Sequence, residues 1–144
     1  MAKAAAWRNR IIGYGEEAPD QLLANPRNWR IHPKAQQDAL AGVLDDVGWV
    51  QPVLVNKASG FVIDGHLRVA MAISHGDKAI PVTYVDLTEV EEAEILASFD
   101  PLGAMAVADK EQLDALLRDV QSGDSAVQAM LADLAAKSGL LYGE

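Results

Sequence analysis

The pentapeptide Asp64-Gly65-His66-Leu67-Arg68 brings a carboxylate, a glycine, an imidazole and a guanidinium together. It follows the apolar run Phe61-Val62-Ile63, so we expect a buried strand that turns directly into a helix at the glycine. A helix N-terminus carries unpaired amide donors and a partial positive charge, which attract anions. A glycine keeps no side chain between a phosphate and the backbone, and an arginine adds a forked cationic donor pair. The pattern is therefore compatible with a phosphate site at Gly65, His66 and Arg68.

Asp64 has several possible roles in this pattern. It can hold a metal ion, accept a sugar hydroxyl or act as a base, with His66 as a phosphate contact or proton shuttle. It is also a favoured N-cap residue, and capping alone would account for it. In that second interpretation Gly65 only forms the turn, and His66 and Arg68 face solvent. Spacing alone favours the plain turn, because short glycine motifs give many false positives.

A second polar cluster spans residues 25–34, Asn25-Pro26-Arg27-Asn28-Trp29-Arg30-Ile31-His32-Pro33-Lys34. Three cationic residues and a histidine stand there just before an expected helix, and Trp29 offers a stacking or cation–π surface. The alternative is a polar loop in which Trp29 fills the core, and spacing alone favours it. Further along, Gln51 lies at the mouth of an expected strand, where it can read a base edge.

The elements that must position these residues follow from apolar periodicity and turn residues. A helix is expected between Pro33 and Gly48, with Ala39, Leu40, Val43, Leu44 and Val47 on one stripe. A second helix is expected from residue 64 to Gly76, with Leu67, Ala70, Met71 and Ser74 on one side. Strands are predicted at residues 52–56, 61–63 and 80–85, the first two as a hairpin, with a further short strand at 10–12. Pro81 indicates that the 80–85 strand lies at a sheet edge or that the proline stands at the strand's start.

The second half of the chain is predicted to be helical. Thr88 and Glu91 have the spacing of a capping box, and the helix that they open is expected to reach about Ser98. Asp100-Pro101-Leu102-Gly103 is predicted to be a break. Two amphipathic helices follow, marked by Leu113, Leu116, Leu117 and Val120 and then by Val127, Met130, Leu131 and Leu134. Residues 109–139 are thus expected to form a helical hairpin.

This order of elements predicts an α+β fold: a small mixed sheet with packed helices and a C-terminal helical hairpin. We expect an N-terminal arm at residues 1–19, one domain at 20–100, and a helical extension at 101–144 on or beside it. The chain of 144 residues is long enough for one domain with a real core.

Charge and composition exclude several classes of protein. The net charge is −9, with a balance of +3 over residues 1–34, −2 over 35–85 and −10 over 86–144. A protein that coats duplex DNA is normally basic, so only a local basic site in the first half is compatible with DNA. The sequence has no cysteine, which excludes disulfides and thiol chemistry, and its three scattered histidines suggest no zinc site. No stretch is long and apolar enough for a membrane span, and the N-terminus lacks a secretory signal, so we expect a cytoplasmic protein.

Three blocks, in order, make residues 22–99 resemble the ParB/sulfiredoxin-like superfamily. Asn25-Pro26-Arg27-Asn28-Trp29-Arg30 resembles its "NPR…R" box. Gly48-Trp49-Val50-Gln51-Pro52-Val53-Leu54-Val55 resembles its "G-Q-P-I-x-V" helix-to-strand block. Ile63-Asp64-Gly65-His66-Leu67-Arg68, followed by Ile80-Pro81-Val82, resembles its "G-x-x-R…V-P-V" phosphate-binding block. Three blocks in order are far more specific than one, and they make the phosphate interpretation the leading one.

The resemblance implies a nucleotide on the glycine turn: CTP as in ParB proteins, or ATP as in sulfiredoxins and free-serine kinases, with Mg²⁺. It implies phosphate or nucleotide contacts from a set of residues: Gly65, His66, Leu67, Arg68, Arg27, Arg30 and Gln51. It also assigns Asp64 to the metal or the substrate, and it makes residues 25–34 a candidate DNA contact. The Asp-Gly-His-x-Arg form is most similar to ParB-like domains of phage and mobile elements, which often accompany DNA methyltransferases. A methyltransferase or another phage protein is accordingly an expected partner.

The sequence also departs from that family. Without a cysteine, the sulfinic-acid reduction of sulfiredoxins is excluded. Leu67 replaces one cation of the Gly-Glu-Arg-Arg block of partitioning proteins, and residues 98–103 replace the "E-N…R" block. Three hypotheses remain open: a nucleotide-binding module in DNA modification or phage DNA processing; an NTPase, small kinase or nuclease that uses Asp64 and His66 with a divalent metal; and a non-catalytic interaction module.

Overall fold

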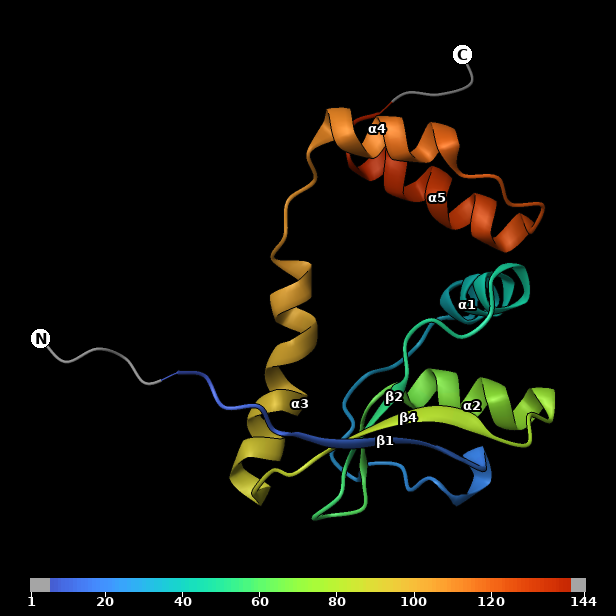
Figure 1. The fold of residues 1–144 in the computed structure, drawn as a ribbon. Helices are drawn as coiled ribbons and strands as arrows, with labels where there is room; N and C mark the ends of the chain where they lie inside the picture. The colour runs from blue at the N-terminus through green and yellow to red at the C-terminus, as the bar shows by residue number, and fades with distance from the viewer. Residues whose placement is uncertain (1–5, 141–144) are drawn as a thin grey trace, which may run out of the picture. The chain divides into compact units, whose positions relative to one another are not determined.

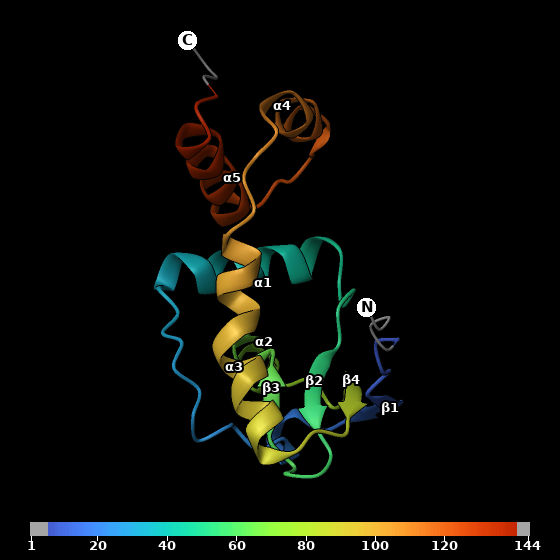
Figure 2. The same cartoon turned by 90° about the vertical axis from the view of Figure 1, so that its left-hand side faces the viewer.

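The computed structural model describes residues 6–140, which divide into two compact units. Of these residues, the first unit holds 6–28 and 51–97, and the second holds 29–50 and 98–140. Figures 1 and 2 draw the elements from two sides. In chain order they are β1 (Ile11–Glu17), the short 3₁₀ helix η1 (Pro19–Gln21), α1 (Lys34–Asp46), β2 (Val53–Asn56), β3 (Val62–Asp64), α2 (His66–His75), β4 (Ile80–Val85), α3 (Glu89–Ala104), α4 (Lys110–Asp119) and α5 (Ser125–Lys137).

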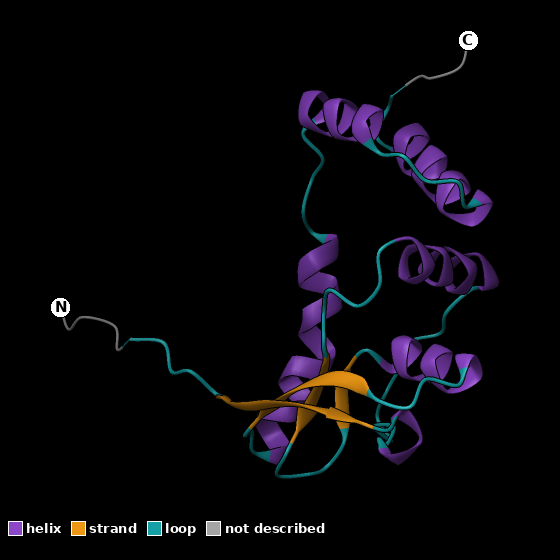
Figure 3. Ribbon diagram, turned by 45° about the vertical axis from the view of Figure 1, so that its right-hand side comes forward, coloured by secondary structure: helices purple, strands orange, loops and turns teal. Residues whose placement is uncertain are grey.

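The first unit is built on a mixed sheet with the strand order β1-β4-β2-β3 (Figure 3). The β2–β3 pair is antiparallel, which confirms the expected hairpin, and β4 runs parallel to β2. The strand expected at residues 10–12 extends to Glu17 and pairs antiparallel with β4. β4 is therefore an inner strand, so the edge alternative for Pro81 was wrong. Its proline stands instead near the strand's start, opposite Glu16.

The core of this unit consists of aliphatic side chains from β2, β3 and β4. Val53, Val62, Ile80 and Val82 are almost fully buried, and α2 adds Val69 and Ala72. Of the four residues predicted to share one side of α2, Leu67 and Met71 are half-buried and Ala70 and Ser74 are exposed, whereas the buried face carries Val69 and Ala72. The direction in which the chain leaves Gly65 determines which face of α2 packs on the sheet. That direction cannot be predicted from the spacing of apolar residues.

The start of α3 is tied to the start of β1. The predicted capping box is confirmed: Thr88 Oγ1 accepts from the Glu91 amide at 3.2 Å, and Glu91 Oε1 accepts from the Thr88 amide at 2.9 Å. Arg10 donates to both carboxylate oxygens of Glu91, at 2.7 and 2.8 Å, and to the Asp86 carbonyl at 2.6 Å. The Arg10 hydrogen bond, with those of Thr88, lowers the pKa of Glu91 to about 2.

The break predicted at residues 100–103 was wrong, because α3 continues to Ala104 with Pro101 inside it. A proline inside a helix removes one hydrogen bond and its ring crowds the carbonyl four residues earlier, but its fixed φ is compatible with helical backbone. The Met105 amide donates to the Pro101 carbonyl at 3.1 Å, so hydrogen bonding continues past the ring. The boundary between the two units falls inside this helix, after Ala97.

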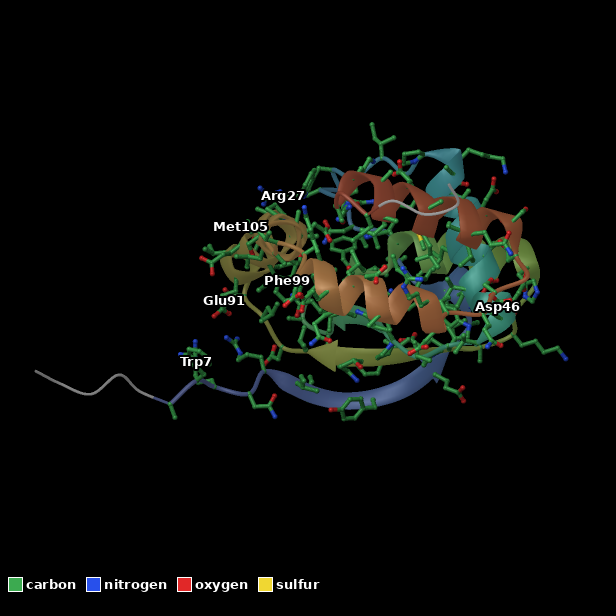
Figure 4. The ribbon with its side chains drawn as sticks, turned by 90° about the horizontal axis from the view of Figure 1, so that it is seen from above. Trp7, Arg27, Asp46, Glu91, Phe99 and Met105 are labelled. Carbon is green, nitrogen blue, oxygen red and sulfur yellow. The ribbon has the colours of Figure 1, made fainter. Side chains whose placement is uncertain are left out.

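In the second unit, α5 packs directly on α1 through Gly42. A Cβ on Gly42 would lie 2.4 Å from Asp124 Oδ1 and 2.7 Å from Val127 Cγ2, so only glycine allows this approach. Ser122 Oγ donates to Asp46 Oδ2 at 2.5 Å at the end of α1, where Figure 4 labels Asp46. The two helices expected over residues 109–139 are present as α4 and α5. Within residues 6–140, no helix has the length and apolar character that crossing a membrane requires.

Candidate functional site

The glycine turn, residues 64–68, joins β3 to α2 in the first unit. Gly65 has φ of 101° and ψ of 19°, a left-handed conformation that glycine adopts without strain. A Cβ there would lie 3.1 Å from Arg68 Nη2 and 3.2 Å from Val53 Cγ2. Both the backbone conformation and the space around it therefore require glycine at this position.

Asp64 is the last residue of β3 and does not cap α2. The N-cap is Gly65, and α2 begins without a side-chain cap, so the N-cap interpretation of Asp64 was wrong. The Asp64 carboxylate instead accepts a hydrogen bond from Arg68 Nη2 at 3.2 Å. The turn thus places a carboxylate and a guanidinium on either side of the glycine.

A second turn, residues 25–28, is attached to the first residue of α2. The Asn25 amide donates to His66 Nε2 at 3.0 Å, a bond between residues 41 positions apart. Asn25 Oδ1 accepts from the Arg27 amide at 2.9 Å, and the Asn25 carbonyl accepts from the Asn28 amide at 3.0 Å. Two of the predicted motifs therefore meet at one hydrogen bond.

This bond defines the chemical state of His66. An imidazole nitrogen accepts only through its lone pair, so Nε2 carries no proton and the neutral ring holds its proton on Nδ1. A proton on Nε2 would set two N–H groups against each other. His66 therefore anchors the 25–28 turn through Nε2.

Two buried donor atoms flank the junction of these turns. Of the side-chain nitrogen and oxygen atoms buried in the described part of the chain, Asn25 Nδ2 and Arg68 Nε have no hydrogen-bond partner. Asn25 is only 4% exposed, and the Arg68 side chain is 18% exposed. A buried donor without an acceptor costs about 1–3 kcal/mol. Both atoms are donors, so what this neighbourhood lacks is hydrogen-bond acceptors.

The other predicted site residues lie at different places. Leu67 is half-buried in the first turn of α2, and Arg27 is exposed on the 25–28 turn. Gln51 is exposed two residues before Val53, which contacts the glycine turn. Arg30 belongs to the second unit, where its guanidinium pairs with Asp100 and lies 5.8 Å from the Trp29 ring centroid. Trp29 is 55% exposed, so the alternative that placed it in the core was wrong.

Sequence reasoning missed two contributors to the site. Asn25 was noted only as part of the 25–34 cluster and its "NPR" block, although its amide connects the two turns and its buried side chain holds the 25–28 turn. Val53 was treated as a strand residue, although its methyl group closes the space beneath Gly65. Asn before Pro is a turn signal that could have pointed to the first of these. Nothing in the sequence pairs Asn25 with His66.

Mg²⁺ was expected together with a nucleotide. Within residues 6–140, no three His, Asp or Glu side chains are grouped so that they could hold a metal ion. A metal ion would therefore need ligands from a bound phosphate in addition to Asp64. The left-handed Gly65 and the two unsatisfied donors fit an anionic group at the glycine turn.

Solved structures with a similar fold are ParB N-domains. The C-terminally truncated chromosome-partitioning protein ParB from Caulobacter crescentus, complexed with CTP-γ-S, matches with a TM-score of 0.58 and 19% identity, over 88% of each chain. Two structures of a pNOB8-like ParB N-domain match with TM-scores of 0.54 and 0.52 and identities of 15% and 16%. They align with 92% of this chain and with 49% and 46% of theirs. This chain has the ParB N-domain fold.

Sequence comparison alone does not reach that result. No protein-family model and no curated protein matches the sequence. The structural match confirms the expected α+β fold with a mixed sheet and its resemblance to ParB. Because 88% of the chain is aligned, the ParB N-domain fold extends beyond the residues 22–99 in which the sequence blocks were found.

Proposed function

We propose that the first unit binds a nucleoside triphosphate, CTP in the first instance, with its phosphates at the glycine turn. The observation that carries the proposal is the pair of buried donors, Asn25 Nδ2 and Arg68 Nε, beside a helix start that has no side-chain cap. Phosphate oxygens are acceptors and are negatively charged, so they supply what both the donors and the helix dipole lack.

The residues proposed for this site share the first unit. Gly65 provides close backbone approach, and the amides of residues 66–68 precede the first helical hydrogen bond, which runs from Val69 N–H to the Gly65 carbonyl. Arg68 provides the cation, and Arg27 follows the buried Asn25 on the attached turn. His66 holds that turn in place, and the exposed Gln51 is available to a sugar or a base. The similar ParB structure holds a CTP analogue, which is why CTP is tested first.

We place this activity in DNA transactions of the kinds in which ParB-like domains occur: partition, DNA modification, or the processing of phage or mobile-element DNA. DNA itself, through residues 25–34, and a methyltransferase or another phage protein are the proposed partners, in the cytoplasm. We propose that residues 20–100 form the domain with this role and that residues 1–19 and 101–144 are extensions of it. No observation favours catalysis by Asp64, because its carboxylate is already paired with Arg68.

Isothermal titration with CTP, ATP and GTP tests the proposal. We expect one of the three to bind, and Arg68→Ala to weaken it by roughly ten- to a hundredfold, the loss of a hydrogen bond to a charged group. Arg118→Ala is the matched control, because it removes the same charge from an Arg that is also paired with an Asp four residues earlier. Absence of heat with all three nucleotides would refute nucleotide binding.

A further inference from the structure

The guanidinium of Arg68 lies directly over the glycine turn. Its Nη2 and Nε atoms are 3.1 and 3.4 Å from the position that a Cβ of Gly65 would take. The same Nη2 atom donates to Asp64 Oδ2 at 3.2 Å. Asp64 thus keeps the Arg68 guanidinium next to Gly65, where a phosphate would approach the backbone.

This ion pair leaves the guanidinium incompletely satisfied. A charge-assisted N–H···O bond typically measures about 2.7–2.9 Å, and the Asp64–Arg68 contact is longer. Arg68 Nε, although buried, has no acceptor. The carboxylate is 36% exposed, so solvent screens its attraction for the cation. An anion that offers several oxygens to the same guanidinium can therefore replace the carboxylate.

We propose that Asp64 is the resting counter-ion of Arg68 and competes with the phosphates of the nucleotide for it. The proposal rests on the proposed function and gives Asp64 a regulatory role: it neutralises and positions Arg68 when the turn holds no ligand, and ligand binding displaces it. Asp64 is then neither a catalytic base nor a metal ligand. Its negative charge also repels an incoming phosphate, so both effects lower the affinity of the wild-type site.

The decisive variant is Asp64→Asn, which keeps the shape of the side chain and removes its charge. CTP, ATP and GTP are titrated calorimetrically into the full chain at fixed ionic strength, once with Mg²⁺ and once with EDTA. We expect the variant to bind the nucleotide roughly two- to fivefold more tightly than wild type in both buffers, the range that loss of a partly exposed ion pair allows.

The chain offers a matched control in Asp114→Asn. Asp114 pairs with Arg118 four residues later at 3.0 Å on α4, so this variant changes the net charge equally and breaks the same kind of pair outside the first unit. Its nucleotide affinity should equal that of wild type. Asp64→Ser serves as a second variant if Asp64→Asn does not fold, which circular dichroism shows.

The outcomes separate this proposal from the proposed function. Nucleotide binding by wild type together with unchanged or weaker binding by both Asp64 variants would overturn the competition and leave nucleotide binding intact. Weaker binding only in Mg²⁺ would overturn it in favour of a metal-ligand role for Asp64. No binding by wild type or by either variant would overturn nucleotide binding itself, and the competition with it. Binding by the variants alone would support both proposals.

Discussion

The helices α2 and α5 begin in opposite ways. At the start of α5, the Asp124 carboxylate accepts from the amides of Ala126 and Val127 at 2.9 and 3.0 Å. At the start of α2 there is a left-handed glycine and no side-chain cap. The chain thus supplies its own anion at the start of α5, a helix that packs on α1. At the start of α2, where we propose a ligand, the N-cap residue is Gly65 and no carboxylate caps the helix.

The surroundings of the two helix starts differ in the same sense. Asp124 lies against Gly42 of α1, so the capped terminus is also a packing contact. Beside the start of α2, the described residues include two buried donors that have no acceptor. Donors at a helix start that bond within the protein stabilise the fold. Donors that are left without an acceptor destabilise it, but they can bind an acceptor from a ligand. The predictions that follow test this contrast.

The largest expected effect is that of Gly65→Ala. The left-handed backbone costs a non-glycine residue roughly 1–2 kcal/mol, and the new Cβ would press on Arg68 and Val53. We expect nucleotide affinity to fall roughly ten- to a hundredfold in calorimetric titration. Gly76→Ala is the control: its φ is +82° at the other end of α2, with nothing within 4 Å. It should lose similar stability and keep the affinity, and equal losses of affinity would remove the special status of the α2 start.

The capped side of the contrast is tested by Gly42→Ala. A methyl group at 2.4 Å from Asp124 Oδ1 must push α5 away from α1, and we expect about 1–3 kcal/mol of destabilisation in urea unfolding. This cost should exceed the gain of about 1 kcal/mol that alanine brings to a helix. Gly103→Ala in α3, where nothing lies within 4 Å, is the matched control and should be neutral or stabilising. A stabilising Gly42→Ala would show that the two helices do not pack as described.

His66→Ala tests the link between the two turns in the first unit. Loss of one hydrogen bond to the Asn25 amide should cost about 0.5–1.5 kcal/mol, and nucleotide affinity should fall by up to about tenfold because Arg27 loses its anchored turn. His66→Gln, whose side-chain oxygen can accept from the same amide, should recover part of the affinity. The His75→Ala variant at the far end of α2 loses its bond to Asp77 and should keep the nucleotide affinity of wild type. If Gln gives no recovery, the Asn25 bond is not what His66 contributes.

The smallest effect is expected at the capped start of α3, where Glu91 is replaced by Gln. Its pKa is about 2 in the folded protein and 4.5 ordinarily, mainly because of the Arg10 hydrogen bond. A lowered pKa stabilises the fold fully above the ordinary value, and this contribution is lost as the pH falls from about 4.5 towards about 2. The urea midpoints of wild type and Glu91→Gln should therefore differ at pH 7, draw closer below about pH 4.5, and converge only as the pH approaches about 2. A constant difference would mean that the charge of Glu91 is not involved.

Part of the fold could be predicted because its determinants are local. The Thr88–Glu91 capping box, the left-handed glycines at 48 and 65 and the β2–β3 hairpin each depend on residues close in sequence. Three predictions made from local preference were wrong. Pro81 was assigned a possible edge position, but β4 pairs with a strand on each side; Pro101 was assigned a helix end, but α3 continues through it; and Trp29 was assigned a possible core position, but it is 55% exposed.

The sequence by itself determined that a glycine stands between a strand and a helix, with Asp64 before it and Arg68 after it. Only the tertiary structure decided that Asp64 binds Arg68 instead of capping α2, that the 25–28 turn is anchored on His66, and that two donors are left buried without acceptors. The physical reason is that a turn is specified by the conformational preferences of neighbouring residues. Hydrogen bonds between segments 41 residues apart depend on the path of the whole chain around the sheet.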